Sequence, residues 1–163
     1  MPMDIQPGST THTDDGTIRV TLDMRNPNNA IISTNMPIPR PEYISSQLAG
    51  YKVFSKLDFK SAFFQLELDE KSRALTVFHA SERLMRFKRL IMGYKLASGE
   101  LNAALRPLFE KMEHFYVIQD DLMVEREDKK QHDPAMDRVF QVIMESGVKI
   151  SPSKCLIAKE KIP

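Results

Sequence analysis

The chain has 163 residues, of which 42% are hydrophobic and 28% are charged, values that predict one folded domain with a core and exclude general disorder. It has no apolar run long enough to span a membrane, it does not start like a secretory signal, and its one cysteine excludes an internal disulfide. We therefore expect an intracellular protein, cytoplasmic or nuclear, with no membrane partner. The net charge of +1 gives no overall signature of nucleic-acid binding.

The N-terminal half shows strand patterns separated by turn residues. Residues 1–16 have no periodicity and predict a flexible tail, so that the folded domain would comprise residues 17–163. Alternating apolar and polar residues then predict a strand over 17–25 that the sequence NPNN ends. An extended proline-rich stretch is expected at 33–42, followed by a short helix at 43–48 that Gly50 stops. A strand is expected at 51–59, a polar turn at 69–73, and a pair of strands at 74–79 and 84–92.

In the C-terminal half the period changes to that of a helix. Apolar residues between Leu101 and Met112 follow helical spacing, with Pro107 expected to kink or break the helix. A hairpin at 117–124 follows, then a helix capped by Asp133 and ended by Gly147, and two short strands in the last residues. This order of elements predicts an α+β fold, with helices packed on one face of a mostly antiparallel sheet.

The hairpin carries two adjacent carboxylates, Asp120 and Asp121, and Asp58 lies near the end of an earlier strand. From this motif alone, a plain polar turn is the favoured reading, because aspartate favours turns. If the strand with Asp58 lies beside the hairpin, however, three carboxylates meet at one edge and form an all-oxygen site suited to Mg²⁺ or Mn²⁺. Two such ions would activate a 3′-hydroxyl and stabilise a pyrophosphate leaving group. An Asp58 side chain pointing away, or a salt bridge to lysine or arginine filling this edge, would end the argument for a polymerase.

A cluster of basic residues with no acidic residue among them lies between Arg83 and Lys95. It suits a phosphate backbone, although a solvated strand with charged edges would look similar. The candidate nucleic-acid-binding residues are Arg83, Arg86, Lys88 and Arg89.

Several segments together resemble the fingers and palm of gypsy-type LTR-retrotransposon reverse transcriptases, in the same order and with nearly the same spacing. They are RVTLDMRNPN, MPIPRPEYISSQLAGYKVFSKLDFKSAFFQLEL, TVF, VIQDDLMV and SGVKISPSKC. The resemblance runs from about Arg19 to Cys155 and implies an RNA-directed DNA polymerase that needs Mg²⁺ or Mn²⁺. Its partners would be an RNA or DNA primer-template and deoxynucleotides.

The resemblance also implies roles for individual residues. Asp58, Asp120 and Asp121 match the metal-binding catalytic carboxylates, the last two being the aspartates of the Tyr-x-Asp-Asp motif. The nucleotide-binding positions are matched by Arg19, which would contact the triphosphate, by Ala62 and the steric-gate aromatic Phe63, and by Tyr94. For Phe63 and Tyr94, ordinary core packing is the alternative.

The sequence also departs from the family pattern. Ile118 replaces the tyrosine of the motif, and Gly93, Lys95 and Glu100 replace family residues around the nucleotide pocket. A lysine in place of a glycine that permits close backbone approach could block template or nucleotide, or distort the turn. The chain ends at Pro163, before the thumb and ribonuclease H regions, so we expect a poor grip on a duplex.

Two functions follow. Retention of all three carboxylates favours an active polymerase domain, because unpaired acids are costly without a metal. The altered pocket and the missing thumb favour a domesticated, catalytically weak or inactive domain that acts as a binding or scaffold module with a protein partner.

Overall fold

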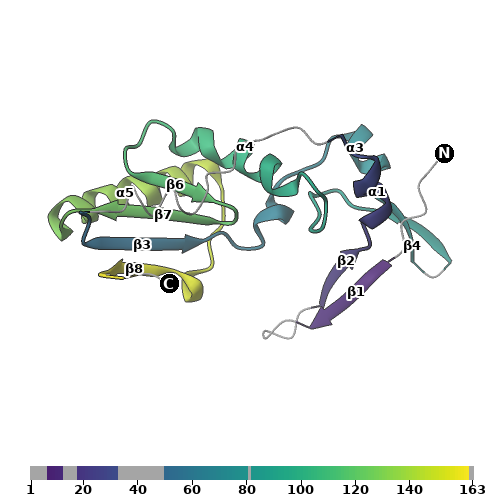
Figure 1. Ribbon diagram of the computed structural model, residues 1–163, viewed down its shortest axis with the longest axis horizontal. Coiled ribbons are helices and arrows are strands. Elements are labelled where there is room, and N and C mark those ends of the chain that lie inside the picture. Colours follow the sequence, from purple (N-terminus) through teal and green to yellow (C-terminus); the bar gives the residue numbers. More distant parts are fainter. Residues whose placement is uncertain (1–6, 13–17, 33–49, 81, 162–163) are drawn as a thin grey trace. The chain divides into compact units, whose positions relative to one another are not determined.

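The computed structural model describes residues 7–12, 18–32, 50–80 and 82–161 (Figure 1). The chain forms two compact units. The first comprises Met1–Asn35 and Phe63–Ala97, and the second comprises Met36–Ala62 and Ser98–Pro163. The proline-rich stretch and the short helix expected at 33–42 and 43–48 lie outside the described residues.

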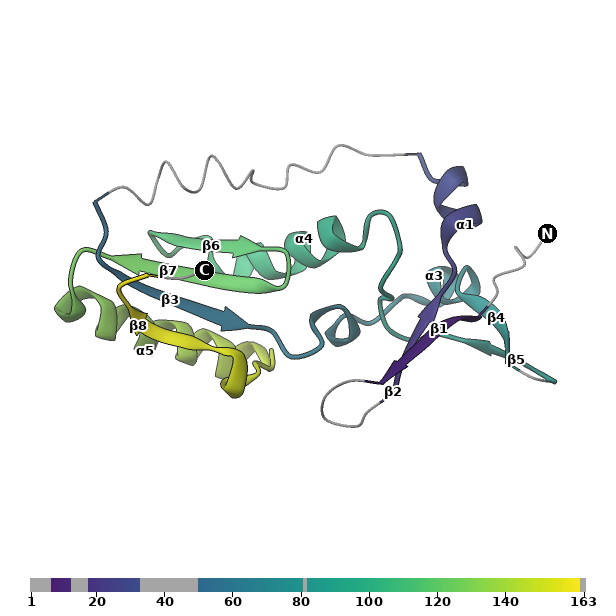
Figure 2. The ribbon, with the colours of Figure 1, turned by 60° about the horizontal axis from the view of Figure 1, so that its bottom comes forward.

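The second unit is built on a four-stranded sheet of β3 (Val53–Asp58), β6 (Phe115–Ile118), β7 (Asp121–Arg126) and β8 (Leu156–Lys159). The strand order is β6-β7-β3-β8, and every neighbouring pair is antiparallel. Figure 2 shows the strands side by side with α5 (Lys129–Ser146) along one face. The predicted α+β class, with an antiparallel sheet covered by helix on one face, is confirmed.

The core of this unit follows from the two-residue period of its strands. Alternate residues of β3 and β7 point to the helix side, and Leu57 and Leu122, which are paired across the two strands, are both 0% exposed. The buried stripe on α5 is Met136, Val139 and Ile143. Helical spacing places these residues on one face together with Phe140, which was also expected to be buried but is only partly so. Apolar burial between α5 and the sheet holds the unit together.

The helix boundaries differ from the prediction at α5. The helix begins one turn early, because the Asp128 carboxylate accepts a hydrogen bond from the Gln131 N–H and caps the helix in place of Asp133. It ends as expected at Gly147, which has a φ of 72° and donates its N–H to the Ile143 carbonyl. The preceding helix, α4 (Ala97–Phe109), continues through Pro107 for two further residues.

A buried polar contact joins three elements of the second unit. Ser55 of β3 and His132 of α5 are both 0% exposed, and the Ser55 hydroxyl lies 2.8 Å from His132 Nε2. The same hydroxyl accepts the Ala158 N–H of β8 at 3.0 Å, while His132 Nδ1 lies 3.3 Å from Asp133. Although these residue types occur in catalytic triads, burial keeps substrate away, so the contact is structural.

Ser55→Ala is therefore expected to lower the free energy of unfolding by about 2–3 kcal/mol, because it leaves the His132 ring nitrogen and the Ala158 N–H buried without their partner. Urea unfolding of the native and variant chains measures this loss. Ser153→Ala, at an exposed position of the short helix η2 (Pro152–Lys154), is the control. A change below about 0.5 kcal/mol at Ser55 would show that the contact is dispensable.

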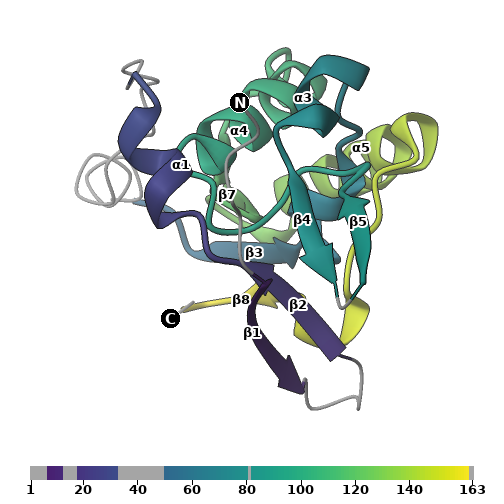
Figure 3. The same ribbon diagram turned by 90° about the vertical axis from the view of Figure 1, so that its right-hand side faces the viewer.

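The first unit contains two antiparallel strand pairs and two short helices, shown in Figure 3. In chain order they are β1 (Pro7–His12), β2 (Ile18–Leu22), α1 (Arg25–Ala30), α3 (Glu70–Ala74), β4 (Val77–Ala80) and β5 (Arg83–Arg86). Leu22, Met24, Phe78 and Ile91 form its small core. None of the helices in the described part of the chain is long and apolar enough to cross a membrane.

Three sequence predictions for this unit were wrong. Residues 7–12 of the expected flexible tail form β1, paired with β2. The NPNN sequence lies in α1, where Pro27 falls in the first turn. Proline is tolerated there because backbone N–H groups in the first turn have no hydrogen-bond partner within the helix. The expected polar turn at 69–73 is α3, because Asp69 caps it by accepting hydrogen bonds from the N–H groups of Lys71 and Ser72.

Candidate active site

The register of β3 and β7 brings Asp58 and Asp121 together. The two residues are directly opposite partners in the antiparallel ladder, so their side chains project from the same face of the sheet. This face is the one opposite to buried Leu57 and Leu122. The strand adjacency that the metal-site prediction required is therefore present.

Asp120 lies in the two-residue connection between β6 and β7. Gln119 before it has a φ of 55°, a left-handed conformation that is uncommon for a residue with a side chain and that reverses the chain tightly. The Asp120 carbonyl accepts the Phe59 N–H at 3.0 Å, directly after β3. Backbone hydrogen bonding thus fixes the connection beside the end of the strand that carries Asp58.

A cation already lies at these carboxylates. Lys56 Nζ is 2.8 Å from Asp121 Oδ2, and the two side chains are 31% and 23% exposed. The hydrogen bond with Asp121 raises the pKa of Lys56, and the charges of Asp120 and Asp58 raise it further, against the opposing effect of burial. All three aspartates therefore act on one ammonium group.

The site fits a divalent metal by donor chemistry and by strand register, but its side chains are not gathered around one point. Three carboxylates supply the oxygen ligands that Mg²⁺ and Mn²⁺ prefer. Within the residues that the structure describes, however, no three His, Cys, Asp or Glu side chains are grouped so that they could hold a metal ion. Asp121 instead binds Lys56, a lysine salt bridge of the kind expected to count against a polymerase site.

Three of the four predicted nucleotide-binding residues belong to the first unit, and Ala62 belongs to the second. Arg19 lies on β2 opposite Thr11, and Phe63 follows buried Ala62 in the short helix η1 (Ala62–Gln65). Tyr94 packs against the core cluster of the first unit, which is the alternative role considered for it. Their binding of nucleotide remains a prediction.

Lys95, which stands where the family pattern has glycine, does not adopt an unusual backbone conformation. Gly93 carries the positive φ, 86°, whereas Lys95 is exposed and is not among the described residues with positive φ. The Asn28 side chain of α1 donates to the Gly93 carbonyl at 2.7 Å and accepts the Lys95 N–H at 2.8 Å. Asn28 thus holds this turn in shape, a role that sequence reasoning missed.

The basic cluster is partly neutralised within the first unit. Arg86 forms a salt bridge with Glu70, and Arg89 forms one with Glu67 at 2.9 Å. Arg83 and Lys88 are exposed and make no ion pair with any residue in the described part of the chain. We therefore expect these two residues to be the more available cations for a phosphate backbone.

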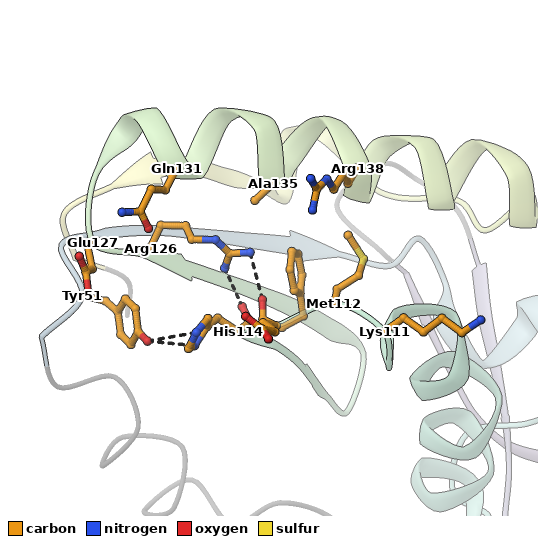
Figure 4. Close-up of a pocket in the computed structure, with 11 residues that line it drawn as sticks. Tyr51, Lys111, Met112, His114, Arg126, Glu127, Gln131, Ala135 and Arg138 are labelled. Atoms are coloured by element: carbon orange, nitrogen blue, oxygen red, sulfur yellow. Dashed lines mark hydrogen bonds between the residues drawn. The ribbon is translucent and has the colours of Figure 1, made fainter.

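A cavity of about 480 Å³ opens at the other end of β7, away from the aspartates (Figure 4). The Tyr51 hydroxyl lies 2.9 Å from His114 Nδ1. Arg126 stacks over the Phe115 ring and donates to the carbonyls of Glu113 and His114. Arg126 is thus engaged by the protein itself, and none of the predicted catalytic residues lines the cavity.

Comparison with known proteins identifies the family. Residues 11–163 match the family described as "Reverse transcriptase (RNA-dependent DNA polymerase)". The chain therefore belongs to the reverse transcriptase family.

Curated relatives are polyproteins of mobile elements and viruses. The chain is 34% identical over 139 residues to the retrovirus-related Pol polyprotein from transposon 412 of Drosophila melanogaster, covering 84% of the chain and 11% of that protein. It is 28% identical over 146 residues to the Pol polyprotein from transposon gypsy of the same organism, covering 88% and 14%. The Genome polyprotein of Petunia vein clearing virus is 26% identical, covering 90% and 7%. The chain thus spans a small part of the length of these relatives.

Solved structures confirm the fold. The foamy viral protease-reverse transcriptase in complex with double-stranded DNA superimposes with a TM-score of 0.83 at 21% identity, covering 94% of this chain and 27% of that one. The same enzyme in complex with an RNA/DNA hybrid gives 0.82 at 20% identity, covering 99% and 22%. At this level of identity the likeness concerns the fold alone.

Proposed function

We propose that the chain is the fingers and palm part of a gypsy-type LTR-retrotransposon reverse transcriptase, an RNA-directed DNA polymerase that adds deoxynucleotides to a primer. The observation that carries this proposal is the register that sets Asp58 directly opposite Asp121, with Asp120 in the adjoining turn. Family membership and the similarity to transposon Pol polyproteins support it.

In this proposal each group of residues has one task. Asp58, Asp120 and Asp121 would hold Mg²⁺ or Mn²⁺, which when bound lowers the barrier to attack by the primer hydroxyl and stabilises the leaving pyrophosphate. Arg19 would bind the triphosphate, and Phe63 with Ala62 and Tyr94 would shape the nucleotide pocket and exclude a ribose 2′-hydroxyl. Arg83, Arg86, Lys88 and Arg89 would contact the primer-template through its phosphates.

The test is extension of a primed RNA template by the purified chain in the presence of Mg²⁺ or Mn²⁺. The double variant Asp120→Asn with Asp121→Asn is expected to lose extension, because it removes two of the three charged ligands. Extension that survives in the double variant, or that proceeds in excess EDTA, would contradict the assignment of the carboxylates.

A second candidate is a domesticated domain that binds a protein partner without catalysis. The ion pair between Lys56 and Asp121 favours it, because a carboxylate engaged by lysine is less available to a metal. If the native chain neither extends a primer nor gains thermal stability with Mn²⁺, this second function replaces the first, since a ligand that binds only the folded state must stabilise it.

A further inference from the structure

Lys56 reaches the aspartates because of its position in β3. It lies two residues before Asp58, so both side chains project from the same face of the sheet. Asp121 is opposite Asp58 and therefore diagonal to Lys56, a separation that a long lysine side chain spans easily. The result is the 2.8 Å contact between Nζ and Asp121 Oδ2.

The charges at this edge need a counter-ion. Asp120 and Asp121 are neighbours in the chain, and Asp58 is paired with Asp121 across the ladder. Three like charges this close repel one another unless a cation lies nearby. The Lys56 ammonium is such a cation, because it touches one carboxylate and senses the charges of the other two.

We propose that Lys56 is a built-in counter-cation of the aspartate site, which binds Asp121 when no divalent metal is bound and competes with the metal for that carboxylate. This inference rests on the proposed function, which assigns the same carboxylates to a metal. The ammonium and a divalent cation repel each other, and both draw on the negative charge of Asp121. Binding of one at Asp121 Oδ2 therefore weakens binding of the other.

The side chain has the freedom that this competition requires. Lys56 is 31% exposed, and its four-carbon stem has rotatable bonds that let the ammonium turn away into solvent. Its neighbours Ser55 and Leu57 are 0% exposed on the opposite face and anchor the strand. The ammonium can leave the carboxylate while β3 keeps its place, so the exchange involves one side chain.

Two consequences follow for the native chain. In the metal-free state the ion pair offsets repulsion among the aspartates and so supports the fold. In the presence of metal the same pair weakens binding, because it must be broken first. A variant without the ammonium is therefore expected to be less stable in EDTA and to bind metal more tightly.

The experiment measures Mn²⁺ affinity by isothermal titration calorimetry and melting temperature with and without Mn²⁺, both without nucleic acid or nucleotide. Lys56→Met keeps the apolar stem and removes the charge. Lys56→Arg keeps a charge. Lys52→Met, at an exposed position four residues earlier, removes the same charge away from the aspartates and serves as the matched control.

Lys56→Met is expected to tighten Mn²⁺ binding by about tenfold, equivalent to about 1.4 kcal/mol, and to enlarge the Mn²⁺-induced rise in melting temperature. Lys56→Arg and Lys52→Met should stay within about twofold of the native affinity. Native binding that Lys56→Met leaves unchanged or weakens would overturn the role of Lys56 while leaving the proposed function standing. If neither the native chain nor Lys56→Met binds Mn²⁺ at millimolar concentration, the metal site and the proposed function both fail.

Discussion

An Asp58→Asn variant is expected to lose primer extension by at least about a hundredfold while unfolding with a free energy no lower than that of the native chain. Asparagine keeps the shape and the backbone hydrogen bonds of the strand, so the pairing with Asp121 is preserved. It removes one of three like charges, which relieves repulsion. A loss of activity without loss of stability separates a residue that serves the chemistry from one that serves the fold.

Extension rates on a primed RNA template and urea unfolding in EDTA measure the two quantities on the same preparations. The control is Asp137→Asn, which removes a carboxylate from an exposed position on α5. It should leave both extension and stability near the native values. An Asp58→Asn chain that extends a primer at the native rate would exclude Asp58 from the catalytic set, and one that unfolds more easily would show that the carboxylate supports the fold.

The second large effect is expected at Glu125, where substitution should remove most of the pH dependence of stability near neutrality. Glu125 is 1% exposed, so its carboxylate is held away from water. Burial raises the pKa of Glu125 to about 7, although the Tyr116 hydroxyl and the Arg126 charge act in the opposite direction. His114 Nδ1 lies 4.0 Å from Glu125 Oε1.

The raised pKa of Glu125 determines the direction in which stability changes with pH. Well below pH 4.5, the ordinary pKa of glutamate, the side chain is protonated in both the folded and the unfolded chain. In that range it does not lower the free energy of unfolding. Between that value and about 7 the unfolded chain releases the proton first, so stability falls as the pH rises, and above about 7 the loss is complete. At about 1.4 kcal/mol per pKa unit, the loss is on the order of 3 kcal/mol.

Glu125→Gln should therefore match the native chain in stability at pH 4 and exceed it by about 2–3 kcal/mol at pH 8. Urea unfolding at a series of pH values gives both numbers. Glu127→Gln, which removes the same charge from an exposed position two residues further on, should follow the pH profile of the native chain. A native profile that does not fall between pH 5 and 8 would mean that Glu125 titrates near its ordinary value.

Local patterns predicted the strands of the second unit well because each contains a short apolar run next to polar or turn residues. The hairpin of β6 and β7, the strand β3 and the buried stripe of α5 all follow from spacing alone. Predictions failed where a polar segment is ordered by a partner far away or by a single cap. The strand β1, with the sequence PGSTTH, has no apolar alternation and is defined only by its pairing with β2. Similarly, the cap was expected at Asp133, whereas the folded chain uses Asp128, which starts the helix five residues earlier.

The candidate site was predictable in part. The residues Asp58, Asp120 and Asp121 came from motif and resemblance, but their closeness depended on the register of two strands that are distant in sequence. The contact of Lys56 with Asp121 was missed, although its position two residues before Asp58 already placed it on the same face of the strand. The roles of Arg19, Phe63 and Tyr94 stay predictions, because these residues belong to the other unit.

The backbone around the end of β3 has a consequence for how this family can vary. The Ser151 N–H donates to the Asp58 carbonyl at 2.8 Å, the Phe59 N–H donates to Asp120, and the Lys60 N–H donates to Lys149. Main-chain atoms, which every amino acid supplies, thus set the spacing of the acids. A residue that contributes only main-chain atoms here, such as Ser151, tolerates substitution, whereas inserting or deleting one residue in β3 would turn Asp58 to the helix-covered face. Relatives should therefore keep the spacing of the acids and place their length differences in the long connections between the strands.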